Sequence, residues 1–296
     1  MLILYCSKPD PYRLKTLAKQ RLDTLLVSLD LCTSRQQAQA LIRTGKVSIN
    51  QQVVDKPGTE VDIASKIQIK ERSRYVSRGG DKLAKALEVF AIPVTDRICL
   101  DGGISTGGFT DCLLQAGAAK VYGVDVGYGQ ADWGLRNDPR VVLKERTNLR
   151  YMTPTELYGD SPVADLAVVD VSFISLDKIL PALWELLVPP KEAVLLVKPQ
   201  FEVGRERVGK KGVVRDSATQ ADAIFQVWKA ARALGWEERG LTWSPLLGPA
   251  GNIEYLLWLG IDREPEPEPR AIEEGVVKER ILEVAKAAAR ELVNRL

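Results

Sequence analysis

The chain has 296 residues, of which 45% are hydrophobic and 27% are charged, and its formal net charge is +2. This length and composition suit one large domain, or a large domain with a smaller one, and exclude a disordered or collagen-like chain. The absence of histidine excludes catalytic triads built on histidine, histidine-ligated metals and a histidine general base.

The charge is unevenly distributed. Residues 1–82 contain 15 Lys or Arg against 8 Asp or Glu, whereas the rest of the chain is slightly acidic. Such asymmetry favours a nucleic-acid-binding module at the N-terminus, although a solvated basic surface would give the same pattern.

The cysteines and the apolar runs indicate the compartment. Cys6, Cys32, Cys99 and Cys112 are far apart and form no CxxC pair, which favours free thiols over disulfides or a zinc site. No signal-peptide pattern and no apolar run of membrane-spanning length is present. We therefore expect a cytoplasmic protein without a bound metal.

The first part of the chain is predicted to be a flexible arm followed by a small α+β domain. Residues 1–13 contain two prolines and no periodic pattern, and the domain spans 14–71. Its predicted elements, in order, are a helix at 21–31, a helix capped by Thr33 or Ser34 and ended by Gly45, a strand at 46–54, a turn at 55–58 and a strand at 61–70. Residues 72–82, RSRYVSRGGDK, are predicted to be a basic linker.

Residues 83–262 are predicted to form an α/β domain, because short apolar strands alternate with helical segments. The predicted strands are 97–102, 120–126, 140–145, 165–173, 193–199, 240–246 and 252–260, and the predicted helices are 83–92, 110–118, 175–187 and 218–235. This order indicates a doubly wound, mostly parallel, seven-stranded sheet with its last two strands as an antiparallel pair at one edge.

The last segment, 263–296, combines a Glu-Pro linker at 263–270 with an amphipathic helix. We expect this helix to pack on the α/β domain.

The stretch LDGGISTGGFTD at 100–111 could belong to three known motifs, and it fits none of them. A P-loop requires a lysine, which the stretch lacks. The elbow pattern from Gly103 to Gly107 requires a histidine base, which the chain lacks. The dinucleotide pattern G-x-G-x-x-G is not met, because the glycines stand at 102, 103, 107 and 108.

What remains is a glycine loop opened by Asp101 and a following strand that ends in Asp125, where an acidic residue would bind ribose hydroxyls. A ligand with a ribose and an adenine but no phosphate, such as S-adenosylmethionine, suits this loop. The alternative is a tight turn that is glycine-rich for the sake of its own packing.

Several longer motifs carry a family resemblance. LDGGISTGGFTD, GVDVGYGQ (123–130), ERTN (145–148), VVDVSFISL (168–176), LVKPQFEVG (196–204) and GPAGNIEY (248–255) resemble the TlyA, or haemolysin A, group of FtsJ-like ribosomal RNA 2′-O-methyltransferases. RLDTLL and SRQQAQALIRTGKVSIN within 21–50 resemble an S4 RNA-binding domain.

The resemblance, which runs from about residue 21 to 260, implies a Rossmann-like class I methyltransferase with an N-terminal S4 domain. It also implies S-adenosylmethionine as cofactor and ribosomal RNA in ribosomal subunits as partner. With the loop chemistry, it points to the following cofactor-binding residues: Asp101, Gly103, Ser105, Gly107, Gly108, Phe109, Asp125, Val126 and Asn148.

The resemblance further implies a catalytic tetrad of Lys82, Asp170, Lys198 and Glu254. Without histidine, a lysine of lowered pKa is a suitable base for a ribose 2′-hydroxyl. We expect Lys198 to accept the proton, Lys82 to lower its pKa and hold the ribose, and the two carboxylates to orient both. The alternative is an ordinary buried ion-pair network.

Basic residues outside the tetrad are candidates for binding RNA. They are Arg21, Arg35, Arg43 and Lys46 in the small domain, Arg74 and Arg78 in the linker, and Lys210 and Lys211 in the glycine-rich loop 203–216. A mobile surface loop is an equal alternative for 203–216. Phe173 and Phe201 could also contact RNA, but aromatic residues in such strands are more often part of the core. Two other functions remain open: a non-catalytic RNA-binding factor in ribosome assembly, and a membrane-active haemolysin.

Overall fold

The computed structural model describes residues 19–69, 74–261 and 273–293. The chain divides into two compact units, Met1–Ser73 and Arg74–Leu296. The predicted arm at 1–13 and the Glu-Pro linker at 263–270 lie outside the described residues.

The first unit is the small α+β domain. Its elements are β1 (Lys19–Arg21), α1 (Leu22–Ser28), α2 (Arg35–Arg43), β2 (Val47–Ile49), β3 (Gln52–Val53), β4 (Glu60–Asp62) and β5 (Ile67–Ile69). Strand β1 pairs with β4, and β2 lies between β3 and β5. The N-cap of α2 is Ser34, whose hydroxyl accepts a hydrogen bond from the amide of Gln37 at 3.2 Å. Apolar side chains of α1 and α2 bury against β2, β4 and β5.

Both strands predicted in this unit are in fact pairs of shorter strands. The stretch 46–54 is interrupted by Asn50 and Gln51, which adopt positive φ angles of 50° and 71° and turn β2 back onto β3. The stretch 61–70 is interrupted after β4, where the Asp62 carboxylate accepts a hydrogen bond from the amide of Ala64. Apolar alternation continues through such tight turns, so it did not reveal them.

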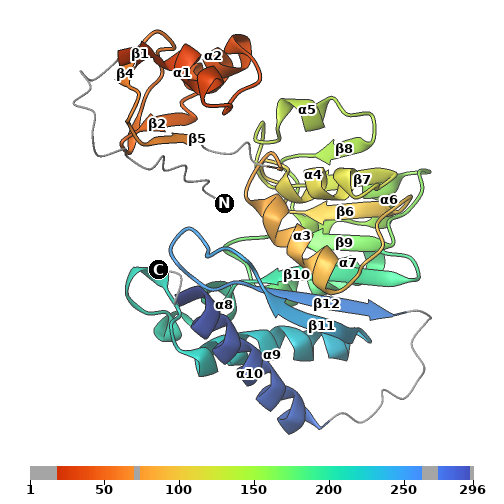
Figure 1. Ribbon diagram of the computed structural model, residues 1–296. Helices are drawn as coiled ribbons and strands as arrows, with labels where there is room; N and C mark the ends of the chain where they lie inside the picture. The colour runs from red at the N-terminus through yellow and green to blue at the C-terminus, as the bar shows by residue number, and fades with distance from the viewer. Residues whose placement is uncertain (1–18, 70–73, 262–272, 294–296) are drawn as a thin grey trace. The chain divides into compact units, whose positions relative to one another are not determined.

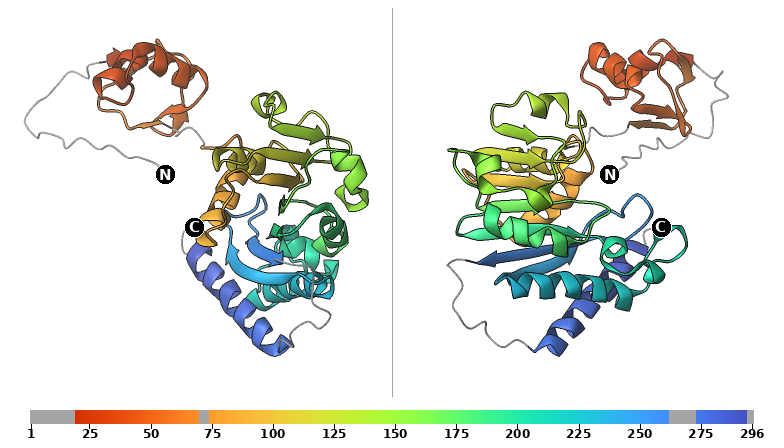
Figure 2. Two further views of the ribbon diagram at one scale, coloured as in Figure 1. Left: turned by 90° about the vertical axis from the view of Figure 1, so that its right-hand side faces the viewer. Right: turned by 180° about the vertical axis from the view of Figure 1, so that it is seen from behind.

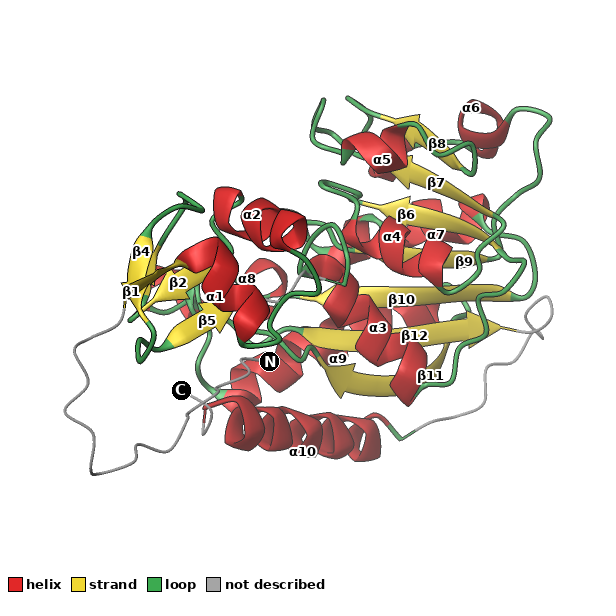
Figure 3. Cartoon of the chain, turned by 45° about the horizontal axis from the view of Figure 1, so that its top comes forward, coloured by secondary structure: helices red, strands yellow, loops and turns green. Residues whose placement is uncertain are grey.

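The second unit is built on a seven-stranded sheet (Figures 1 and 3). Its strands are β6 (Ile98–Gly102), β7 (Lys120–Val124), β8 (Val141–Lys144), β9 (Leu166–Val169), β10 (Lys191–Val197), β11 (Glu237–Trp243) and β12 (Tyr255–Ile261). The order is β11-β12-β10-β9-β6-β7-β8, and the last five of these are parallel. Strand β12 is antiparallel to both β10 and β11. The predicted doubly wound sheet with an antiparallel edge pair is confirmed.

Helices cover both faces of this sheet. They are α3 (Gly79–Val89), α4 (Gly108–Gln115), α5 (Trp133–Arg136), α6 (Pro154–Tyr158), α7 (Leu180–Leu186), α8 (Pro199–Glu202), α9 (Ser217–Ala233) and α10 (Glu274–Val293), with short 3₁₀ turns η1 (Leu149–Tyr151), η2 (Leu176–Lys178), η3 (Arg205–Arg207) and η4 (Lys210–Gly212). Alternate residues of the strands β6 to β10 and β12 enter two separate cores. One core contains α3 and α4, and the other contains α7, α9 and α10.

The C-terminal helix packs on the second unit, as predicted. Helix α10, blue in Figure 2, lies along α9 and also contacts β11. Its residues Val277, Ile281 and Ala285 are buried in the core. None of the helices in the described ranges is long and apolar enough to span a bilayer.

The predicted linker at 72–82 is wrong as a boundary, because its described part belongs to the second unit. Tyr75 is buried in the core, and α3 begins at Gly79. A Cβ atom on Gly80 would lie 2.1 Å from the Tyr75 ring, so this glycine is needed for the close packing. The sequence RSRYVSRGGDK has no helical periodicity, so the beginning of α3 was not visible in it.

Candidate active site

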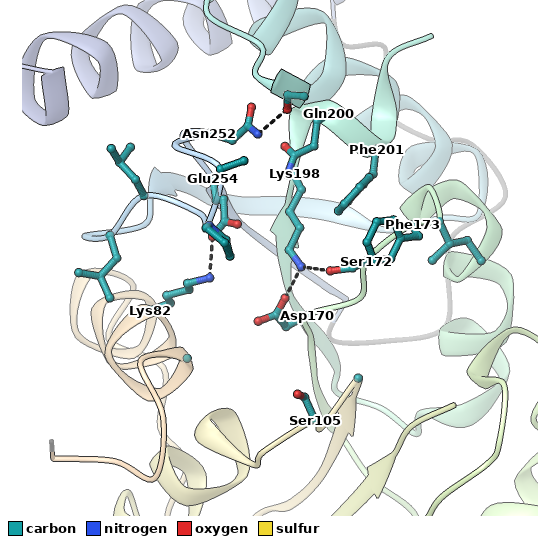
Figure 4. Close-up of a pocket in the computed structure, with 18 of the residues that line it drawn as sticks. Lys82, Ser105, Asp170, Ser172, Phe173, Lys198, Gln200, Phe201, Asn252 and Glu254 are labelled. Atoms are coloured by element: carbon teal, nitrogen blue, oxygen red, sulfur yellow. Dashed lines mark hydrogen bonds and ion pairs between the residues drawn. The ribbon is translucent and has the colours of Figure 1, made fainter. Parts of the chain in front are cut away.

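A cavity of about 1190 Å³ opens in the second unit at the carboxyl ends of the parallel strands. The segments following β6, β9 and β10 line it, together with the start of α3 and the segment before β12. In doubly wound sheets this edge is where ligands bind. Lys82, Asp170, Lys198 and Glu254 all line the cavity, so the structure brings the four proposed catalytic residues together (Figure 4).

These four residues form two ion pairs. The Lys198 Nζ lies 2.6 Å from Asp170 Oδ1, and the Lys82 Nζ lies 2.6 Å from Glu254 Oε2. Lys198 and Glu254 are buried, with exposed fractions of 7% and 1%. Charged groups this buried are costly unless they are paired, and both of these are.

Lys198 makes two further contacts. Its Nζ donates hydrogen bonds to the carbonyl of Val171 at 2.9 Å and to the hydroxyl of Ser172 at 2.7 Å. With Asp170, these two groups give the amine three oxygen neighbours. Sequence reasoning missed Ser172, although its position two residues after Asp170 at a strand end was a signal that could have found it.

The segment that carries Glu254 is held in place by the buried side-chain amide of Asn252. Asn252 accepts a hydrogen bond from the amide of Val214 at 2.9 Å and donates one to the carbonyl of Gly212 at 2.8 Å. It therefore ties the segment before β12 to the loop 203–216. Asn252 lines the cavity and was also missed by sequence reasoning.

Three glycines of the stretch 100–111 are required by neighbouring protein atoms. Gly103 has a φ of +89°, and a Cβ there would lie 2.5 Å from the carbonyl oxygen of Asp170. Gly107 has a φ of +95°, and its Cβ would lie 2.2 Å from Leu135. A Cβ on Gly108 would lie 2.8 Å from the amide nitrogen of Gly80. Packing thus explains these glycines, while Gly103 and Gly108 also line the cavity, as do Ser105 and Phe109.

Asp101 lies beneath this loop and does not line the cavity. Its Oδ2 accepts a hydrogen bond from the Thr110 hydroxyl at 2.6 Å, and its Oδ1 is buried with no hydrogen-bond partner among the described residues. Burial raises the pKa of Asp101 to about 7, with Asp170 and Asp125 adding smaller effects in the same direction. The structure thus places Asp101 as a support of the loop and not as a wall of the cavity.

This pKa predicts a pH-dependent effect of Asp101→Asn. Between the ordinary pKa and about 7, the folded wild type holds a proton that the unfolded chain releases, so its stability falls as pH rises. Asparagine does not titrate, so the stability of the variant should lack this dependence on pH. We expect the stability of the variant relative to wild type to increase by roughly 2–3 kcal/mol between pH 5 and pH 8. Urea unfolding at both pH values measures the free energy of unfolding of the two proteins. The same difference between variant and wild type at pH 5 and at pH 8 would contradict the prediction.

Asp125 also serves the loops in this structure. Its two carboxylate oxygens accept hydrogen bonds from the amides of Ser105 at 2.8 Å and Gly127 at 2.7 Å. Val126 beside it is exposed, and Asn148 caps η1. Asp125, Val126, Asn148 and Gly107 do not line the cavity, so their assignment to a cofactor stays a prediction.

In the small unit, two candidate RNA-binding arginines surround a buried acid. Asp23 accepts hydrogen bonds from Arg21, Arg35 and Gln39. The Arg21 hydrogen bond is the largest cause that holds the pKa of Asp23 well below its usual range. Arg21 and Arg35 therefore stabilise the unit, while their side chains stay about half exposed. Arg43 is exposed and Lys46 is partly buried.

The remaining candidates lie in the second unit. Arg78 lines the cavity, and the guanidinium of Arg74 lies 5.2 Å from the centre of the Tyr75 ring. Lys210 and Lys211 are exposed and line a separate hollow of about 490 Å³ together with Arg207 and Arg215.

The expectation that Phe173 belongs to the core is wrong. Strand β9 ends at Val169, and Phe173 is 91% exposed at the mouth of the cavity, with a φ of +65°. Its ring lies 5.1 Å from the partly buried ring of Phe201.

Comparison with known proteins identifies the family. The FtsJ-like methyltransferase profile matches residues 75–261, which is more than half of the chain, and the S4 domain profile matches 20–67. The chain belongs to the FtsJ-like methyltransferase family. Its α/β unit is therefore a Rossmann-like methyltransferase domain, and its first unit is an S4 domain.

Individual relatives cover nearly all of this FtsJ-like chain. A Bacillus subtilis protein, YqxC, described as a candidate rRNA methyltransferase, is 49% identical over 86% of the chain and 91% of its own length. The 16S/23S rRNA (cytidine-2′-O)-methyltransferase TlyA of Mycobacterium tuberculosis is 48% identical over 87% of the chain and 96% of its own length. A solved structure from Streptococcus thermophilus, described as a candidate hemolysin, has a TM-score of 0.70 and 42% identity, and covers 95% of this chain and 99% of that one.

Proposed function

We propose that this FtsJ-like protein transfers a methyl group from S-adenosylmethionine to ribose 2′-hydroxyls of ribosomal RNA, with Lys198 as the proton acceptor. The observation that carries the proposal is the pairing of two lysines with two carboxylates on the walls of one cavity. The name of the Mycobacterium relative, an rRNA 2′-O-methyltransferase, supports the substrate.

The donor groups at the glycine loop fit S-adenosylmethionine. The stretch 100–111 has no lysine or arginine for a phosphate, while Ser105 offers a hydroxyl at the cavity, which the buried Phe109 also lines. Asp125 lies beside Ser105, where it could bind ribose hydroxyls. When bound, the cofactor supplies a methyl group that its sulfonium already activates. No group of three or more Cys, Asp or Glu side chains within the described ranges is arranged to hold a metal ion.

The proton is handled by Lys198. Lys198 Nζ, in its deprotonated form, would accept the hydroxyl proton as the 2′-oxygen takes the methyl group that the bound cofactor would supply. The ammonium so formed is stabilised by Asp170 Oδ1, the Val171 carbonyl and the Ser172 hydroxyl. Lys82, oriented by Glu254, would hold the ribose. Most of the rate would come from positioning, because the methyl donor is already reactive.

The test of this function is methyl transfer from labelled cofactor to unmodified ribosomal subunits and to free ribosomal RNA. The expected result is label in ribose 2′-O positions. Label on a base, or no transfer by folded protein that binds the cofactor, would contradict the proposal.

We also propose that the hollow lined by Lys210 and Lys211 binds phosphates of the RNA. Both lysines are exposed, and the hollow shares Gly209 with the main cavity. In the S4 domain, the exposed parts of Arg21 and Arg35, with Arg43 and Lys46, would contact RNA. In the second unit, Arg74 and the cavity-lining Arg78 would contact RNA.

Replacing Lys210 and Lys211 together by Ala should weaken RNA binding uniformly across sequences. Each lost phosphate contact reduces the salt dependence, so the slope of log K against log salt should fall by roughly 1.5–2. The charge-matched control is the double variant Lys229→Ala/Lys286→Ala, which removes two exposed lysines of α9 and α10. An unchanged slope in the Lys210/Lys211 variant would rule out this phosphate site.

A further inference from the structure

The loop 170–176 carries the groups that surround Lys198. It follows β9 and contains Asp170 and Ser172, which contact the Lys198 amine, and the exposed Phe173. Phe173 has a φ of +65°, a conformation that a bulky side chain rarely adopts. Such strained backbone persists only where its surroundings fix it.

Two side chains from one short segment hold this loop on either side of Phe173. On one side, the Lys198 amine contacts Asp170, the Val171 carbonyl and Ser172. On the other side, the Glu202 carboxylate accepts hydrogen bonds from the Ser175 hydroxyl at 2.6 Å and the Leu176 amide at 3.1 Å. Lys198 precedes α8 and Glu202 ends it, and a spacing of four residues brings two side chains to the same side of a helical turn.

Glu202 occupies an unusual position for a glutamate. It is partly buried, and within the described residues its carboxylate forms no ion pair. Burial raises the pKa of Glu202 to about 7, and the neighbouring Asp177 raises it further, against the hydrogen bonds from Ser175 and Leu176. A carboxyl in such surroundings is costly. The hydrogen bonds that its side chain forms within the described residues are all with the loop 170–176.

We infer that Glu202 is a positioning residue of the methyl-transfer site, which clamps the loop 170–176 so that Asp170 and Ser172 stay in contact with Lys198. This role rests on the proposed function. Glu202 does not line the cavity itself, so it acts through the loop and not on the substrate.

The test compares Glu202→Ala, Glu202→Gln and Ser175→Ala with the control Glu185→Ala, an exposed glutamate of α7. Amide hydrogen exchange of the intact protein, read out on the peptide 170–178 after digestion, measures how firmly the loop is held and needs no substrate. Loss of the two hydrogen bonds should speed exchange at residues 173–176 on the order of tenfold in Glu202→Ala. Glu185→Ala should leave it unchanged. Glu202→Gln, which keeps one acceptor oxygen, should fall between.

Kinetics then separate positioning from a general loss of stability. In Glu202→Ala we expect kcat to fall on the order of tenfold, KM for the cofactor to stay within about twofold, and Glu202→Gln to recover much of kcat. Unchanged exchange, or fast exchange with normal kcat, would overturn the inference. If wild type transfers no methyl group, the proposed function fails, whereas normal wild-type activity with an unaltered Glu202→Ala rejects only the clamp. Ser175→Ala keeps the test valid if Glu202→Ala does not fold.

Discussion

Replacing Lys198 with Ala is expected to reduce methyl transfer roughly 10²–10⁴-fold, the contribution typical of a positioned general base. Lys198 is the amine that three acceptors hold on the wall of the cavity. Without it, the 2′-hydroxyl would lose the proposed acceptor of its proton. Single-turnover transfer from labelled cofactor to ribosomal RNA measures the change, with cofactor binding checked by calorimetry.

A matched variant distinguishes the lost base from a disturbed fold. Lys198→Met keeps the length and apolar stem of the side chain but cannot accept a proton, so it should be as inactive as Lys198→Ala. Ser172→Ala removes only one acceptor of the amine and should cost far less. Full activity in folded Lys198→Met would show that another group takes the proton.

The sheet was predictable from the sequence because most of its strands are apolar and bounded by polar turns or helices; β11, whose sequence EERGLTW is largely polar, is the exception. Buried strands of a parallel sheet need apolar residues on both faces, and β9 and β10 show this directly. In the S4 domain the strands have two to three residues, so turns at Asn50 and Gln51 were hidden inside an alternating pattern.

The tetrad was predictable only in part. The motif resemblance supplied its residues, and the edge of the sheet supplied the reason for their convergence. The pairing of Lys198 with Asp170 and of Lys82 with Glu254 could not be read from the sequence. The first pair joins the segments that follow β10 and β9, and the second joins α3 to the segment before β12. Such contacts between distant segments leave no local pattern in the sequence.

The glycine stretch shows how chemistry and packing overlap. Sequence reasoning weighed a cofactor loop against a tight turn, and the structure contains the features of a tight turn at Gly103 and Gly107. Close approach of protein backbone and an open face toward a ligand are compatible, because Gly103 meets Asp170 on one side and the cavity on the other. Glycine content alone therefore does not separate the two.

The Lys82–Glu254 pair allows the catalytic interpretation to be tested against that of a structural ion pair. Lys82→Ala would leave Glu254, which is 1% exposed, without its cation. Removing one partner of a buried ion pair costs about 3–5 kcal/mol. We therefore expect the free energy of unfolding, measured with urea, to fall by an amount approaching this range. Methyl transfer should also fall, because Lys82 would no longer hold the ribose.

The double variant Lys82→Met/Glu254→Met separates the two effects. It removes both charges, and replacing a buried ion pair by apolar groups of similar volume is often close to neutral in stability. We therefore expect unfolding near that of wild type. If Lys82 acts on the ribose, methyl transfer should stay as low as in Lys82→Ala, on the order of 10²-fold below wild type. A stable double variant with normal methyl transfer would instead mean that the pair only supports the fold, and that Lys198 and Asp170 perform the chemistry without it.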